Sequence, residues 1–204
     1  MTTLLVATNN PGKIREFREL LAALPVTITF PKESGLNLEV AETGLTFEEN
    51  ARIKAAAYAQ ATGLVTLADD SGLEVDALGG APGVWSARYA GAQASDSDRV
   101  RKLLSALVDV PPGKRTARFR CVVAVAGPAG DVQTAEGRCE GNIVLAPRGD
   151  NGFGYDPVFA VQGYGGLTMA ELPPELKNQV SHRARALMAA RQILAEVLAP
   201  RRGE

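Results

Sequence analysis

The chain has 204 residues, of which 46% are hydrophobic, a composition typical of a globular protein with its own core. Its 22 basic and 23 acidic side chains give a formal net charge of −1, which excludes a global attraction to nucleic acid or to an anionic membrane. The two cysteines, Cys121 and Cys139, suggest neither a disulfide framework nor a zinc site, and we expect buried thiols in a cytoplasmic protein without a signal peptide.

Helical and strand-like patterns alternate first and give way to consecutive strands later in the chain. In chain order, we expect a strand at 4–7, a helix at 14–24, a helix from the capping box at 46–49 to about 62, a strand at 65–68, a helix at 100–107, two antiparallel strands from 116 and from 132, a short strand at 158–161 and a final helix at 181–198. This order predicts an α/β protein with a mixed sheet. No linker interrupts the chain, so we expect one domain over residues 1–200 and a tail at 201–204.

Several familiar sites are excluded by composition and spacing. The chain has one histidine, His182, which rules out a two-histidine zinc motif. No G-x-G-x-x-G fingerprint and no Walker loop is present. Any nucleotide site must therefore be built from other residues.

The segment Thr8-Asn9-Asn10-Pro11-Gly12-Lys13 lies between the first strand and the first helix. A helix N-terminus offers free amides and a positive dipole end, so an anion such as phosphate would be stabilised there. Thr8 and Asn10 would add donors and Lys13 a charge. The alternative is an ordinary Asn-Pro-Gly turn with a solvated lysine.

Asp69 and Asp70 follow the apolar run at 65–68, and we expect both at the C-terminal end of that strand. Two adjacent carboxylates require a compensating positive charge, and Mg²⁺ prefers such oxygen ligands together with water and substrate phosphates. Glu42 is a candidate for the second metal carboxylate, and Lys54 for neutralising charge on leaving oxygens. The alternative is that the acids are turn, cap and surface residues and that Lys54 is a solvated side chain.

The segment 149–157 alternates aromatic residues with glycines, a pattern that a core strand does not tolerate. Phe153 or Tyr155 could stack on a nucleobase, and Asp156 could accept hydrogen bonds from ring N–H groups. The alternative is a loop whose aromatic rings cover the edge of the core.

Donors gather at 177–183, where Ser181 is the expected N-cap of the last helix. Lys177, His182 and Arg183 lie there together. Because a cation near a helix N-terminus is unfavourable without a partner, Arg183 suggests an anionic or carbonyl-bearing ligand. The alternative is that His182 is an ordinary packed residue.

Together these segments resemble the inosine triphosphate pyrophosphatase family, whose members are also described as dITP/XTP pyrophosphatases or Ham1-like non-standard purine NTPases. The matching blocks run in the family's order from residue 4 to about residue 198: 8–13, 42–47, 49–51, 54–55, 69–73, 78–83, 86–89, 152–157 and 181–183. Residues 127–148 and 162–170 match weakly. The resemblance implies an elongated two-lobed fold, with helices around a mixed sheet and an active-site cleft between the lobes.

The resemblance also implies roles for individual residues. It makes Asp70 the general base and a Mg²⁺ ligand, Glu42 the second metal ligand, and Lys13 and Lys54 the catalytic lysines. The substrate-binding residues it implies are Thr8, Asn9, Asn10, Pro11, Gly12, Lys13, Ser71, Phe153, Gly154, Tyr155, Asp156, Lys177, His182 and Arg183. A task for Asp69 does not follow from it.

The expected activity is hydrolysis of ITP, dITP and XTP to monophosphate and pyrophosphate by a Mg²⁺-dependent homodimer, with no nucleic-acid or membrane partner. One rival is a Maf-like nucleotide pyrophosphatase with another base preference, although the Maf-like loops differ from 153–156 and 181–183. A second rival is a nucleotide sensor without catalysis, which would be expected to lack the acids that this chain retains.

Overall fold

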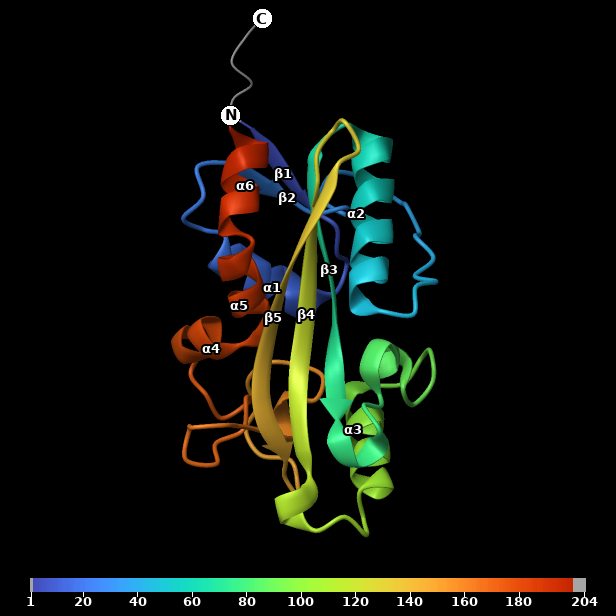
Figure 1. Ribbon diagram of the computed structural model, residues 1–204, viewed down its shortest axis with the longest axis vertical. Helices are drawn as coiled ribbons and strands as arrows, with labels where there is room; N and C mark the ends of the chain where they lie inside the picture. Colours follow the sequence, from blue (N-terminus) through green and yellow to red (C-terminus); the bar gives the residue numbers. More distant parts are fainter. Residues whose placement is uncertain (1, 200–204) are drawn as a thin grey trace, which may run out of the picture. The chain divides into compact units, whose positions relative to one another are not determined.

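The computed structural model describes residues 2–199, and its strands form one six-stranded sheet in the order β2-β1-β3-β4-β5-β6 (Figure 1). The strands are β1 (Thr3–Val6), β2 (Thr27–Thr29), β3 (Val65–Val75), β4 (Thr116–Ala126), β5 (Val132–Ile143) and β6 (Phe159–Val161). β1 is parallel to β2 and to β3, whereas β5 and β6 are antiparallel. The predicted mixed sheet is therefore confirmed.

Six α-helices accompany the sheet in the described part of the chain. They are α1 (Pro11–Leu20), α2 (Phe47–Thr62), α3 (Asp96–Ala106), α4 (Pro174–Val180), α5 (His182–Ala189) and α6 (Arg191–Leu198). The predicted capping box of α2 is present, since Thr46 and Glu49 each bind the other's backbone N–H. None of these helices combines the length and the apolar character needed to cross a membrane.

Several elements differ from the expectation, including α1 and α3, which were expected at 14–24 and 100–107 and which both begin and end earlier. β2 and α4 were not predicted, because three and seven residues are too few to show a periodicity. The expected helix at 181–198 is divided at Ala190 into α5 and α6. The expected strand at 65–68 continues to Val75. The predicted tail, 201–204, lies outside the described residues.

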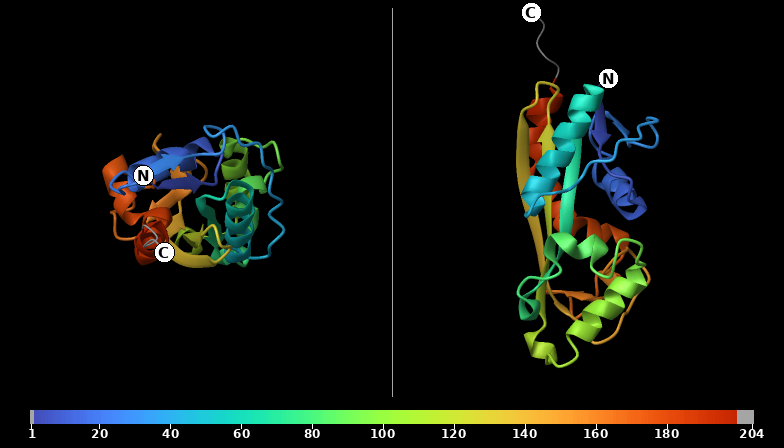
Figure 2. Two further views of the ribbon diagram at one scale, coloured as in Figure 1. Left: turned by 90° about the horizontal axis from the view of Figure 1, so that it is seen from above. Right: turned by 90° about the vertical axis from the view of Figure 1, so that its right-hand side faces the viewer.

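The described chain divides into two compact units, the first formed by residues 2–70, 121–137 and 183–199 and the second by 71–120 and 138–182. In the first unit, α2 (cyan) and the pair α5–α6 (red) lie on opposite sides of the strands (Figures 1 and 2). Because strand residues alternate between faces, one set of buried strand residues packs with α1, α5 and α6, and includes Leu4, Val6, Leu67, Val123 and Val125. Their buried neighbours Leu5, Ala68, Val122 and Ala124 have the opposite parity.

The second unit has a separate core. It gathers Leu73 and Val75 of β3, Leu103 of α3, and aromatic residues of β4 and β6. Arg115, 3% exposed, donates to the carbonyl oxygens of Leu107 and Val110 after the end of α3. Each unit thus holds its elements around its own apolar cluster.

Candidate active site

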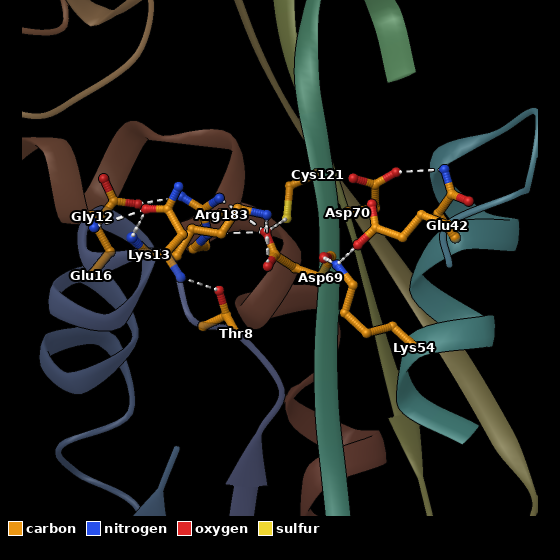
Figure 3. A network of polar contacts seen from close by, with 12 residues as sticks. Thr8, Gly12, Lys13, Glu16, Glu42, Lys54, Asp69, Asp70, Cys121 and Arg183 are labelled. Atoms are coloured by element: carbon orange, nitrogen blue, oxygen red, sulfur yellow. Dashed lines mark hydrogen bonds and ion pairs between the residues drawn. The ribbon is translucent and has the colours of Figure 1, made fainter. Parts of the chain in front are cut away.

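Asp69 and Asp70 lie within β3 and not at its end, so their side chains leave the strand on opposite faces (Figure 3). This corrects the expected placement at a strand terminus. Polar residues at 69–72 conceal the strand in the sequence, but buried Leu73 and Val75 continue it. The expected compensating positive charge is present at Asp69, where Lys13 and Arg183 supply it.

Asp69 is 1% exposed and binds two cations. Lys13 Nζ lies 2.9 Å from Oδ2, and Arg183 Nη2 donates to the same oxygen at 2.9 Å. Burial alone would raise the pKa of Asp69, but the charges of Lys13 and Arg183 outweigh it and hold that pKa far below its ordinary value. Asp69 is therefore a permanent anion that fixes the two cations.

Arg183 belongs to the same buried network. Its guanidinium is 1% exposed and also pairs with Glu16 of α1, so two acids surround it. Burial would lower the pKa of Arg183, but Asp69 and Glu16 raise it. The guanidinium of Arg183 thus forms ion pairs with Asp69 and Glu16. Its contact with a purine stays a prediction.

Cys121 lies on the same face, with Sγ 3.8 Å from Asp69 Oδ2. Burial and the charge of Asp69 raise the pKa of Cys121 well above its ordinary value, so the thiol stays protonated. Both cysteines are buried thiols outside any disulfide, as predicted.

The start of α1 is organised as a capped helix. Asn10 Oδ1 accepts from the backbone N–H groups of Gly12 and Lys13 at 2.9 and 3.1 Å, and Pro11 occupies the first turn. Thr8 Oγ1 accepts from Asn10 N at 3.2 Å. The predicted helix start is confirmed, whereas phosphate binding at 8–13 stays a prediction.

Asp70 lies on the α2 side of β3 and is 7% exposed. Its Oδ2 accepts a hydrogen bond from Asn50 Nδ2 at 3.0 Å. Burial raises the pKa of Asp70 above its ordinary value, the charge of Glu42 adds to this, and Lys13 and Lys54 oppose it. The carboxylate is consequently a stronger base than an exposed aspartate.

Lys54 connects the acids from its place on α2. Its Nζ lies 2.5 Å from Glu42 Oε1 and donates to the backbone carbonyl of Asp69 at 2.9 Å. Burial would lower the pKa of Lys54, but the charges of Asp69 and Glu42 outweigh it and raise that pKa. The lysine is therefore charged and held between the two acidic segments, which excludes the solvated alternative.

A second polar cluster lies in the other unit, at the loop 152–156. Lys177 and Asp156 are both buried, and Lys177 Nζ lies 2.6 Å from Asp156 Oδ2. The same oxygen accepts from Phe153 N at 3.0 Å, and the half-buried Phe153 ring lies 5.3 Å from Lys177 Nζ. Any side chain at Gly152, whose φ is +81°, would collide with this ion pair.

Neighbouring residues anchor this loop. Gly154 N donates to Asp96 Oδ2 at 2.7 Å. Tyr155 is 4% exposed within the core, and its hydroxyl donates to Ser86 O at 2.9 Å. Ser86 Oγ accepts in turn from Leu73 N of β3 at 2.9 Å. Tyr155 thus anchors the loop to the core of the second unit. Phe153 is then the candidate ring for stacking on a nucleobase.

The residues around the start of α5 are mostly buried. The ring of His182, 7% exposed, stacks on Phe119 with centroids 4.7 Å apart and an interplanar angle of 14°. Ser181, the expected N-cap of the last helix, is the C-cap of α4 and directly precedes α5, which begins at His182. Ser71 is half-buried and follows Asp70 on β3. Asn9, like Asn10 and Pro11, is exposed.

Sequence reasoning missed Glu16, Asn50 and Asp96. Glu16 follows Lys13 by one helical turn, a signal that could have paired it with a neighbouring cation. Asn50 directly follows the capping box at 46–49, and Asp96 begins α3. Their partners are distant in sequence, so spacing alone could not identify them.

Known proteins resemble this chain over nearly its whole length. The model of the Ham1 family matches residues 4–193. The chain is 48% identical over 194 residues to the dITP/XTP pyrophosphatase of Bacillus subtilis (95% of this chain, 98% of the relative), and 54% identical over 187 residues to that of Geobacter sulfurreducens (92% and 94%).

Solved structures agree with these relatives. A HAM1 protein from Coxiella burnetii has a TM-score of 0.85 and 43% identity, covering 96% of this chain and all of that one. The nucleoside-triphosphatase, or dITP/XTP pyrophosphatase, from Mycobacterium abscessus has a TM-score of 0.75 and 45% identity, covering 92% and 98%. With a family match and identities of this size over nearly its whole length, the chain belongs to the Ham1 family.

Proposed function

We propose that this protein is a nucleoside triphosphate pyrophosphatase that hydrolyses dITP, XTP and ITP to the monophosphate and pyrophosphate. The observation that carries the proposal is the gathering of two lysines at residues 69–70 of β3: Lys13 Nζ lies 2.9 Å from Asp69 Oδ2, and Lys54 Nζ donates to the backbone carbonyl of Asp69 at 2.9 Å, next to the buried Asp70. The names of the relatives, dITP/XTP pyrophosphatase, point to the same reaction.

In this proposal the triphosphate binds where the positive charges lie. Lys13 at the first turn of α1 would contact phosphate oxygens, together with the donors of Thr8, Asn10 and Ser71. Lys54 would neutralise charge that develops as pyrophosphate leaves. Phosphoryl transfer depends on position and counter-charge, so it requires no nucleophilic side chain. The protonated thiol of Cys121 is consistent with this mechanism.

Asp70 is the proposed general base. Its raised pKa brings it nearer to the range in which a carboxylate can accept a proton from water at neutral pH. The water it orients would attack the phosphorus that joins the nucleoside to pyrophosphate. Asp69 cannot serve as this base, because its charge is already fixed by Lys13 and Arg183.

Glu42 and Asp70 are the proposed Mg²⁺ ligands. Lys54 Nζ pairs with Glu42 Oε1 and donates to the backbone carbonyl of Asp69, so it links Glu42 to the strand residue that precedes Asp70. Mg²⁺ typically takes one or two carboxylates from the protein and completes its shell with phosphate oxygens and water. When bound, Mg²⁺ supplies charge neutralisation to the phosphates.

The keto purine is the proposed partner of the 152–156 loop and of the donors at 177–183. Phe153 would stack on the base, Asp156 would accept from its N–H groups, and Lys177, His182 or Arg183 would donate to the six-position carbonyl. Adenine presents an amino group there, which would leave a buried donor unpaired at a cost of roughly 1–3 kcal/mol. This selects against ATP.

The test is release of pyrophosphate from dITP, XTP, ITP, GTP and ATP, each with Mg²⁺ and with EDTA. We expect release from the first three substrates with Mg²⁺ only, and much slower release from ATP. Orthophosphate as the first product, equal rates on ITP and ATP, or full activity in EDTA would each contradict the proposal. A pyrimidine preference would favour a Maf-like enzyme instead.

We also propose a cytoplasmic homodimer that acts on free nucleotides, as the family resemblance implies. Light scattering of the purified protein tests the assembly, with twice the 21.5 kDa chain mass as the expected result. A monomer at working concentration would contradict it.

A further inference from the structure

Asn50, on the first turns of α2, is 1% exposed and uses both ends of its amide. Its Oδ1 accepts from Gly44 N at 2.8 Å, and its Nδ2 donates to Asp70 Oδ2 at 3.0 Å. One side chain therefore joins the loop that carries Glu42 to the strand residue Asp70, whose surroundings Figure 3 shows. Asn50 is neither the proposed base nor a proposed metal ligand or substrate contact.

The orientation of this amide follows from its partners. A backbone N–H can only donate, so the oxygen of Asn50 must face Gly44. The NH₂ group then faces Asp70, and Asp70 Oδ2 must accept. Asn50 thus requires Asp70 Oδ2 to be a hydrogen-bond acceptor.

The loop partner is held just as closely. A Cβ added at Gly44 would lie 2.6 Å from Glu49 Cβ and 2.8 Å from Asn50 Oδ1, so no side chain fits there. Glu49 Oε2 also accepts from Leu45 N at 2.6 Å and from Thr46 N at 3.2 Å. The segment that follows Glu42 is therefore fixed to the start of α2 by hydrogen bonds to the side chains of Glu49 and Asn50.

We propose that Asn50 is a positioning residue, which holds the Asp70 carboxylate and the Glu42 loop in one fixed arrangement for the reaction. It touches neither substrate nor water in this role. The inference rests on the proposed function, in which Asp70 and Glu42 act together. Because productive geometry is narrow, a small displacement of Asp70 has a large effect on turnover.

Two substitutions separate the contacts of Asn50. Asn50→Asp keeps the shape and the acceptor for Gly44 N, but it replaces the donor that faces Asp70 by an acceptor. Asn50→Ala removes both contacts. Asn37→Asp is the matched control, because Asn37 is exposed in a loop and the change adds the same charge.

We expect both Asn50 variants to lower kcat for dITP by about a hundredfold, since the base and the metal acids lose their common support. KM for dITP should change by less than about threefold, because the phosphate and base contacts remain. Calorimetric titration with Mg²⁺ alone should show weaker binding to both variants. Asn37→Asp should match the wild type in all three measurements.

A fourth protein tests whether the loss is only structural. Asn50→Asp combined with Asp70→Asn restores a donor and an acceptor between the two positions, so its thermal midpoint should return toward that of the wild type. Its kcat should remain low, because the acid is on α2 and not on β3.

Asn50 variants with wild-type kcat would overturn the inference, as would losses that match the unfolded fraction measured by circular dichroism. Recovery of kcat in the combined variant would also overturn it. A wild-type protein that releases no pyrophosphate would instead refute the proposed function, so the two failures are distinguishable.

Discussion

Asp69 and Asp70 are neighbours in sequence, identical in chemistry and both buried, yet they lie in opposite electrostatic surroundings. On the α1 and α5 face, Lys13 and Arg183 neutralise Asp69 and lower its pKa. On the α2 face, burial and Glu42 raise the pKa of Asp70. A one-residue step along a strand changes the face, and with it the function a carboxylate can have.

The two aspartates therefore have different roles, Asp69 in stability and Asp70 in the proposed reaction. Asp69 balances buried cations, so its charge contributes to the stability of the first unit. Asp70 carries a charge that burial disfavours, so it is retained at some cost to stability, as is common for reactive groups. The predictions that follow test this division.

The largest effect is expected for Asp69→Asn. The change leaves the buried Arg183 and Lys13 without a shared anion, and removing one partner of a buried ion pair costs about 3–5 kcal/mol. Urea unfolding at pH 7 measures the loss. Combining Asp69→Leu with Glu16→Gln and Arg183→Met should restore part of it, because the buried charges of this network are then removed together. A loss below about 1 kcal/mol, the size typical of an exposed pair, would remove Asp69 from its structural role.

Asp70→Asn should reduce turnover and not stability. We expect kcat for dITP to fall at least about a hundredfold with the loss of the base, while nucleotide affinity stays near that of the wild type. Steady-state kinetics and calorimetric titration with a non-hydrolysable analogue measure the two quantities. Full turnover in this variant would exclude Asp70 from the mechanism.

A smaller effect concerns stability and pH without metal. The raised pKa of Asp70 means that the folded state holds this proton more tightly than the unfolded chain does. Asp70 therefore contributes stability below the ordinary aspartate pKa of 3.8, and this contribution is lost as pH rises through its folded pKa. In EDTA, Asp70→Asn should become increasingly more stable than the wild type as pH rises from 3.8 through the folded pKa of Asp70.

Urea unfolding at several pH values measures this gap. Asp69→Asn is the control, because the lowered pKa of Asp69 gives the opposite sign: its contribution is present at neutral pH and is lost only in strong acid. A constant gap between Asp70→Asn and the wild type would contradict the raised pKa.

The smallest effect is expected for Cys121→Ala. The thiol is buried beside Asp69 but stays protonated, so kcat should equal that of the wild type. Loss of a small buried side chain should cost about 1 kcal/mol, or roughly 2–4 °C in Tm for a protein of this size. If kcat is unchanged in Cys121→Ala but falls in Asp70→Asn, the reaction depends on the Asp70 face of β3 and not on the Asp69 face. A large loss of kcat would give the Asp69 face a part in the chemistry.

Elements with a strong local signal could be predicted from the sequence. The capping box predicted the start of α2, and the turn before Lys13 predicted the start of α1. The mixed sheet followed from the order of patterns. Each of these depends on residues within one or two turns of each other.

Features that depend on distant partners could not be predicted. The two faces of β3 were hidden because polar residues at 69–72 ended the apolar run that predicts a strand. The bonds of Arg183 to Asp69 and to Glu16 span 114 and 167 residues. No spacing rule reaches so far, so the sequence placed Arg183 near a ligand and could not reveal the acids around it.

The fully buried guanidinium of Arg183 also has a consequence for biosynthesis. Its acidic partners Glu16 and Asp69 belong to the first seventy residues, whereas Arg183 is translated 114 residues after Asp69. Until then the nascent first unit holds two carboxylates with no arginine to balance them. The first unit, which also contains residues 121–137 and 183–199, is therefore not complete until Arg183 has been translated.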